Sequence, residues 1–178
     1  TAAKYGKRVV ALGGGKNNMV VMPDADLEQV ANAFISAGYG AASQRCMAIS
    51  NLMAVGQETA DALVKILKEK IEALKVGSYQ DGADYGPVIS PQAKQAILAS
   101  IDQGEEEGAS VVVDGRHKDI TKEEKGFFLA PTLFDHVKPG MSIYEQEIFG
   151  PVRNLIRVDT LDEAISLINK HELGNGVT

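Results

Sequence analysis

Short apolar runs alternate with amphipathic segments along most of this chain, and this alternation constrains its fold most strongly. Strand-like runs occupy residues 8–12, 19–22, 49–55, 109–113 and 127–137. Helix-like spacing of apolar side chains occupies residues 27–37, 57–75, 91–104 and 161–168. Strands that alternate with helices predict an α/β fold, with a mainly parallel open sheet flanked by helices.

Several helix starts are marked by their capping residues. Asp24 and Asp26 offer N-caps before the first helix. Ser90 is followed by proline at the first helical position of another. Thr160 and Glu163 have the spacing of a capping box, so we expect a helix to begin directly after Thr160.

Charge and composition exclude several kinds of partner. The 178 residues carry a formal net charge of -6, which argues against nucleic acid or an acidic membrane surface as the main partner. No apolar run approaches the length of a membrane span, and the first residues lack a signal-peptide core. A single cysteine suits a reducing compartment, so we expect a cytoplasmic protein, or one of the mitochondrial matrix in a eukaryote.

The ends of the chain indicate a longer parent protein. Thr1 is not an initiator methionine, and residues 173–178 have the pattern of a strand that is only beginning. We therefore interpret residues 1–178 as one excised piece.

Cys46 is the only cysteine, and its surroundings favour chemistry. It follows the small-residue run 37–42 and the cation Arg45, and an adjacent cation favours the thiolate, which is the nucleophilic form. The small residues leave room for a substrate. A free cysteine that packs as a small hydrophobe is the common alternative, and this segment alone leaves both open.

The histidines give no second catalytic group. His117, His136 and His171 stand in polar or strand-end positions without a zinc-ligand spacing or a Cys–His signature. We expect all three on the surface, and we expect no metal site.

Three segments together resemble the aldehyde dehydrogenase superfamily. These are the glycine-rich segment 12–17, the cysteine motif 44–46 and the segment 145–152, which reads Glu-Gln-Glu-Ile-Phe-Gly-Pro-Val. Their order and spacing carry the resemblance, which runs through nearly the whole chain. It implies that residues 1–178 are a fragment of the catalytic domain, with a cofactor domain upstream and a C-terminal tail outside the fragment.

The resemblance implies roles for four residues. Cys46 would attack the aldehyde carbonyl, and NAD would then accept the hydride to leave a thioacyl-enzyme. Glu147 would accept hydrogen bonds from the nicotinamide ribose, Phe149 would pack near the nicotinamide, and the Gly13 backbone would lie against the same end of the cofactor. The alternatives are a surface carboxylate for Glu147, a core aromatic for Phe149 and an ordinary strand-to-loop glycine for Gly13.

One position departs from the hydrolytic members of the family. They carry a water-activating glutamate where this chain has Leu12, and no carboxylate lies within residues 9–16. The branch that oxidises methylmalonate or malonate semialdehyde shows the same loss and releases its acyl group to coenzyme A. The sequences of residues 11–17 and 44–50 resemble that branch. Arg45 would then bind the substrate carboxylate bidentately, although it could instead serve only inside the domain.

The sequence therefore predicts an NAD-dependent, CoA-acylating semialdehyde dehydrogenase. A hydrolytic enzyme that uses another base, such as Glu145, is the runner-up, and a noncatalytic scaffold on the same fold is the alternative of another class. Lys16 and Asn17 have an open role, in structure or in function. The resemblance also implies that the full-length protein is a homo-oligomer with a small-molecule semialdehyde as its substrate.

Overall fold

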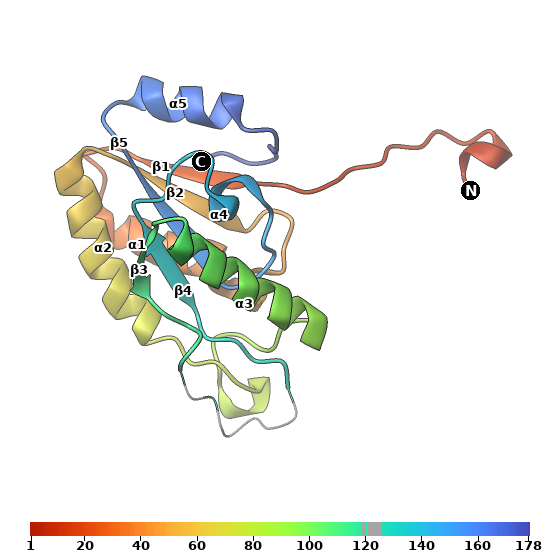
Figure 1. Cartoon of the computed structure of the whole chain (residues 1–178), viewed down its shortest axis with the longest axis horizontal. Coiled ribbons are helices and arrows are strands. Elements are labelled where there is room, and N and C mark those ends of the chain that lie inside the picture. The colour runs from red at the N-terminus through yellow and green to blue at the C-terminus, as the bar shows by residue number, and fades with distance from the viewer. Residues whose placement is uncertain (119, 121–125) are drawn as a thin grey trace.

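A mainly parallel five-stranded sheet forms the centre of the computed structural model, which describes residues 1–118, 120 and 126–178 (Figure 1). Its strands are β1 (Asn17–Val21), β2 (Ile49–Val55), β3 (Ser110–Val113), β4 (Thr132–Asp135) and β5 (Val152–Val158). Their order is β1-β2-β5-β4-β3, and only β3 runs antiparallel to its neighbour. The predicted α/β class is confirmed.

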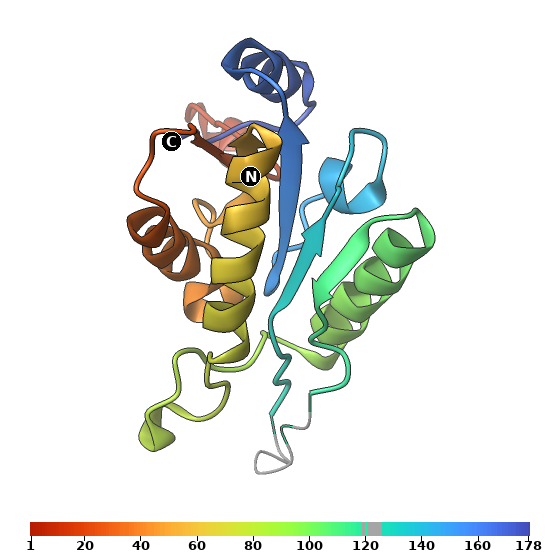
Figure 2. The ribbon, with the colours of Figure 1, turned by 90° about the vertical axis from the view of Figure 1, so that its left-hand side faces the viewer.

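Helices cover both faces of this sheet. They are α1 (Leu27–Tyr39), α2 (Gln57–Glu72), α3 (Pro91–Glu106), α4 (Ser142–Glu145) and α5 (Leu161–Lys170). Figure 2 shows α1 and α2 on one side of the sheet and α3 on the other. The crossover through α1 leads from β1 to β2, whereas α5 leads from β5 back past β1. Right-handed crossovers in opposite directions place their helices on opposite faces, so α5 packs across from α1.

The predicted helix starts agree with the structure. Asp26, Ser90 and Thr160 each accept a hydrogen bond from the backbone N–H three residues later, which satisfies one of the free donors of the first turn. The Glu163 carboxylate reaches back to the Asp159 N–H at 2.7 Å. The capping side chains therefore fix the positions where these helices begin.

The strand predicted at residues 8–12 is wrong. Val10 and Leu12 are 82% and 89% exposed, and this segment extends away from the body of the chain (Figure 1). An apolar run becomes a strand only where a neighbour accepts its backbone hydrogen bonds, and no described segment pairs with it. Pairing begins instead at Asn17.

The predicted strand 127–137 is shorter than expected. Only Thr132–Asp135 join the sheet, directly after Pro131, which has no N–H to donate to a ladder. The charged loop predicted at 117–126 lies partly outside the described residues. In the described chain, no helix is both long enough and apolar enough to cross a membrane.

Candidate active site

The three motifs meet at one edge of the sheet. The glycine-rich segment directly precedes β1, the cysteine motif precedes β2, and the Glu147 segment precedes β5. These three strands are adjacent and parallel, so the loops before them lie together at the amino ends of the strands. Residues of all three loops line one small cavity there, among them Gly15, Arg45 and Glu147.

A strained turn presents Cys46. Ala41, Ala42 and Ser43 all have positive φ, at 56°, 51° and 67°, a region that costs a non-glycine residue about 1–2 kcal/mol. Cys46 follows on an exposed turn, where its N–H donates no hydrogen bond to any described residue. Its thiol and its N–H are therefore both available.

Arg45 binds the end of a helix. Its Nη2 donates to Ser36 O at 2.7 Å and to Ala37 O at 3.0 Å, two carbonyls in the last turn of α1. Ser36 O also accepts from the Gly40 N–H. Nη1 and Nε of Arg45 donate no hydrogen bond to any described residue, and the side chain is exposed. The guanidinium thus holds the end of α1, and Arg45 also lines the cavity.

A second arginine, which the sequence analysis missed, completes this cap. Arg153 is 3% exposed and donates to Gly38 O at 2.9 Å and to Gly150 O at 2.9 Å. Its guanidinium lies 5.7 Å from the ring centroid of Tyr39, and burial lowers its pKa to about 10. No carboxylate among the described residues pairs with it. Its charge therefore adds a positive potential to the floor of the cavity that it lines.

Two glycines make room for these arginines. A Cβ on Gly38 would lie 3.3 Å from the Arg153 side chain, and one on Gly40 would lie 3.0 Å from Arg45 Nη2. The small residues before Cys46 thus accommodate two guanidinium groups, in addition to the space that the sequence analysis assigned to a substrate.

Glu147 lies against the glycine-rich segment. Its Oε1 accepts a hydrogen bond from the Gly15 N–H at 3.1 Å, and a Cβ on Gly14 would come within 3.0 Å of Oε2. The carboxylate is exposed, and Oε2 accepts no hydrogen bond from a described residue. Phe149, with φ of 55°, is 45% exposed on the same loop, so it is not a core aromatic. Gly13 is exposed and has open space around it.

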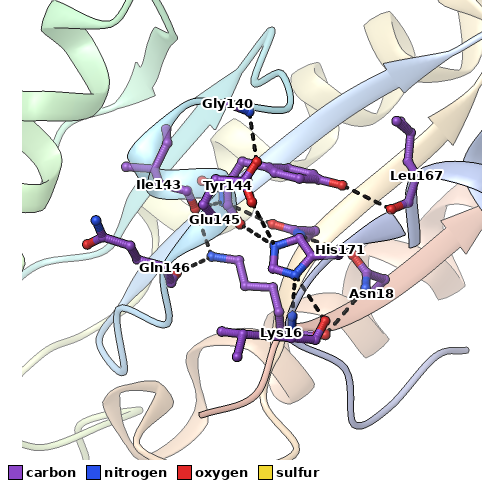
Figure 3. Close-up of polar contacts among 12 residues, drawn as sticks. Lys16, Asn18, Gly140, Ile143, Tyr144, Glu145, Gln146, Leu167 and His171 are labelled. Carbon is purple, nitrogen blue, oxygen red and sulfur yellow. Dashed lines mark hydrogen bonds and ion pairs between the residues drawn. The ribbon is translucent and has the colours of Figure 1, made fainter. Parts of the chain in front are cut away.

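Lys16 holds the Glu147 loop through hydrogen bonds to its backbone. It is 1% exposed, and its Nζ donates to Ile143 O at 2.7 Å and to Gln146 O at 2.6 Å (Figure 3). Burial, with the nearby charge of Arg153, lowers the pKa of Lys16 to about 7. The lysine thereby joins the start of β1 to the backbone directly before Glu147.

Asn17 holds the Cys46 loop. It is 2% exposed, and its Nδ2 donates to Cys46 O at 2.9 Å and to Ala48 O at 2.8 Å. Its Oδ1 accepts from the Gly176 N–H at 2.9 Å. The structure thus gives Lys16 and Asn17, whose role the sequence left open, buried hydrogen bonds to two different loops.

An asparagine ladder supports the same edge, and it too was missed. Asn18, Asn51 and Asn154 are paired across β1, β2 and β5 and are all buried. Asn51 donates to Asn18 at 3.0 Å, and Asn154 donates to Asn51 at 2.9 Å and to Ile143 O at 2.7 Å. Polar residues at one register position within three apolar strands were the available signal.

The prediction that all three histidines lie on the surface is wrong for His171. Its side chain is 2% exposed, with Nε2 at 2.9 Å from Tyr144 O and Nδ1 at 2.9 Å from the Leu173 N–H. A tautomer with Nε2–H satisfies both contacts. Its ring packs 5.0 Å from the Tyr144 ring, so His171 fixes α4 to the segment after α5 (Figure 3).

Glu145 faces this histidine and not the cavity. Its Oε1 accepts from the Gly140 N–H at 2.8 Å, and its Oε2 lies 3.9 Å from His171 Nε2. Glu145 does not line the cavity that holds Arg45 and Glu147.

Comparisons with known proteins match this chain along nearly its whole length. The sequence model described as the aldehyde dehydrogenase family matches residues 1–178. A malonate-semialdehyde dehydrogenase of Pseudomonas aeruginosa is 50% identical over 174 residues, which are 97% of this chain and 35% of that protein. The acylating mitochondrial methylmalonate-semialdehyde/malonate-semialdehyde dehydrogenase of Bos taurus is 46% identical over 175 residues, 98% of this chain and 32% of that protein.

Solved structures have the same fold. The crystal structure of a putative methylmalonate-semialdehyde dehydrogenase from Sinorhizobium meliloti 1021, complexed with NAD, superposes with a TM-score of 0.95 at 52% identity. It is matched over 99% of this chain and 36% of its own length. The chain thus spans about a third of the length of these relatives.

Proposed function

We propose, from the premise that this chain belongs to the aldehyde dehydrogenase family, that it is a fragment of the catalytic domain of an NAD-dependent, CoA-acylating semialdehyde dehydrogenase. The observation that carries the proposal is that the loops of Cys46 and Glu147 precede adjacent parallel strands, β2 and β5. Arg45 and Glu147 line one cavity there, and Cys46 lies on the exposed turn directly after Arg45. The substrate would be methylmalonate or malonate semialdehyde, as the names of the relatives suggest.

Cys46 is the proposed nucleophile. Its thiolate would add to the aldehyde carbon and form a thiohemiacetal, whose oxyanion needs hydrogen-bond donors. The unused N–H of Cys46 is such a donor and is adjacent to the reacting sulfur. The family resemblance implies a second donor, an asparagine upstream of this chain.

Arg45 is the proposed carboxylate-binding residue. A guanidinium can donate two parallel hydrogen bonds to a carboxylate. The contacts of Nη2 with the end of α1 fix the guanidinium beside Cys46 and leave Nη1 and Nε for a ligand. Arg153 adds positive potential below the same cavity, which favours a substrate that carries a negative charge.

The residues present fit NAD at the Glu147 end of the cavity. Oε2 of Glu147 is free to accept a ribose hydroxyl, Phe149 offers an exposed ring, and Gly13 leaves the backbone approachable. NAD, when bound, would accept the hydride of the thiohemiacetal. The contribution of this chain is to orient that end of the cofactor toward Cys46.

The lack of a water-activating base supports release of the acyl group to coenzyme A. Leu12 cannot accept a proton, and the Glu145 carboxylate accepts from the Gly140 N–H, with its other oxygen 3.9 Å from His171 Nε2. The CoA thiolate would attack the thioacyl carbon, the bond to Cys46 would break, and the Cys46 thiolate would be restored. An acyl-CoA is then the product.

Mass spectrometry of the full-length enzyme tests this proposal. After mixing with semialdehyde and NAD but no CoA, we expect an acyl adduct on Cys46, which CoA removes. The Cys46→Ala variant should form neither the adduct nor NADH. Substantial NADH from Cys46→Ala would contradict the assignment.

We further infer a homo-oligomer in a reducing compartment for the full-length protein. The lone exposed thiol must stay reduced to act, which suits the cytoplasm or the mitochondrial matrix, and the bovine relative is named mitochondrial. Light scattering of the full-length protein would measure the number of subunits.

A further inference from the structure

Two side-chain amides bind the backbone carbonyl of Cys46. Asn17 Nδ2 donates to it at 2.9 Å, and Asn175 Nδ2 donates to it at 2.7 Å. A carbonyl oxygen has two lone pairs, so these amides satisfy it fully. Asn17 comes from β1 and Asn175 from the segment after α5, so two parts of the chain converge on one atom of the nucleophile loop.

The segment that carries Asn175 is itself fixed along the free edge of β1. Lys16 N donates to Gly174 O at 2.9 Å, and Asn18 N donates to Gly176 O at 3.0 Å. Gly176 N in turn donates to Asn17 Oδ1 at 2.9 Å. Asn17 thus binds Cys46 with one end of its amide and the Asn175 segment with the other.

Small residues allow the close approach. A Cβ on Gly15 would lie 3.4 Å from Asn175 Cβ, and one on Gly176 would lie 2.8 Å from Met47 Cε. Asn175 has φ of 133°, a region that favours glycine, so its backbone is held in a strained conformation while its amide reaches Cys46.

The bound carbonyl belongs to the peptide group between Cys46 and Met47. Fixing this group fixes the position of the Cys46 Cα and restricts the conformations open to the thiol and to the free N–H. The thiolate must reach the carbonyl carbon while the N–H points at the carbonyl oxygen, and preorganised geometry of this kind accounts for large rate factors in catalysis.

We propose that Asn175, together with Asn17, is a positioning residue for Cys46. Through this pair, the segment after α5 holds the loop that carries Cys46 in place. This inference rests on the proposed function and adds to it a residue that none of the three motifs contains.

Two variants at Asn175 and a control variant at Glu172, all in the full-length enzyme, test the inference. Asn175→Asp keeps the shape but places an acceptor against the Cys46 carbonyl. Asn175→Gly removes the amide and suits the backbone conformation. Glu172→Ala, at an exposed position of the same segment, is the matched control. The readouts are the rate of the first NADH turnover, the Kd for NAD, and hydrogen exchange of the peptide that spans residues 44–48.

If the amide positions Cys46, the first turnover falls about tenfold in Asn175→Gly and at least as far in Asn175→Asp, with the Kd for NAD unchanged. Hydrogen exchange of residues 44–48 should be several-fold faster in both variants. A residue that only filled space would be replaced by aspartate without loss. A wild-type rate and wild-type exchange in Asn175→Asp would therefore overturn the inference.

The two proposals fail separately. NADH production by Cys46→Ala would refute the proposed nucleophile. The hydrogen exchange of residues 44–48, in contrast, measures how firmly Asn17 and Asn175 hold the Cys46 loop, and it requires no turnover. Unchanged hydrogen exchange in both Asn175 variants would refute the positioning role of Asn175 even if Cys46 proved to be the nucleophile.

Discussion

Lys16 and Asn17 are consecutive residues that hold the two halves of the site in place. The Lys16 ammonium binds Ile143 O and Gln146 O, next to Glu147, while the Asn17 amide binds Cys46 O and Ala48 O. Successive side chains of an extended chain point in opposite directions, so one dipeptide reaches both loops. The spacing between the proposed nucleophile and the proposed cofactor-binding carboxylate thus depends on Lys16, directly before β1, and on Asn17, its first residue.

The buried Lys16 makes stability depend on pH. Its pKa is lowered to about 7 from an ordinary value of 10.5, so between these values the unfolded chain binds more protons than the folded chain. Stability from this group is constant below the lower value, and it rises with pH between the two. In Lys16→Met this rise is absent.

Urea unfolding between about pH 6 and pH 10 measures the effect. The free energy of unfolding of the unmodified protein, minus that of Lys16→Met, should increase above about pH 7. Lys68→Met, on the exposed face of α2, should show no such pH-dependent difference. A difference that is flat or that falls with pH would show that Lys16 remains protonated in the folded protein.

Arg45 has two roles to separate, at the helix end and toward the substrate. Arg45→Leu should slow turnover of every aldehyde, because the end of α1 loses both hydrogen bonds from Arg45. It should slow carboxylated aldehydes about tenfold more than uncharged ones of equal length, because only they lose the charged contact.

The ratio of kcat/KM for the two classes of aldehyde is the measurement. Arg45→Lys, which keeps the charge without the planar fork, should give an intermediate ratio. Equal losses for both classes would limit Arg45 to its contacts with α1.

Glu147→Gln should weaken NAD binding about tenfold, because it removes a charged acceptor. The fold should persist, since the glutamine oxygen can still accept from the Gly15 N–H. Calorimetric titration of the full-length protein with NAD measures this.

Glu145→Gln is the matched control for that variant. Glu145 lies two residues away and faces His171, so this change should leave NAD affinity unaltered. It should also leave CoA-free acid production unaltered. A loss of acid production would identify Glu145 as the base of a hydrolytic enzyme.

Much of the fold could be predicted from local sequence. Asp26, Ser90 and Thr160 cap helices through contacts with residues three positions later. Such short-range patterns can be recognised in the sequence. Val9 and Val10 misled the prediction, because an apolar run does not reveal whether a neighbouring strand exists to pair with it.

The site was predicted as motifs but not as a set of contacts. Cys46 and Glu147 stand in recognisable segments, and the position of each segment before a strand suffices to bring them to one edge. Arg153, Asn175 and the ladder of Asn18, Asn51 and Asn154 depend on partners far away in the sequence. His171 was misplaced for the same reason, since its partner Tyr144 lies 27 residues away.

Rapid mixing of the full-length enzyme with semialdehyde and NAD, with and without CoA, tests the central claim most directly. Because Leu12 replaces the water-activating base, we expect a burst of about one NADH per Cys46, followed by slow turnover. CoA should accelerate the slow phase and yield an acyl-CoA. Fast steady turnover to the free acid without CoA would contradict the account, because another group would then have to activate water.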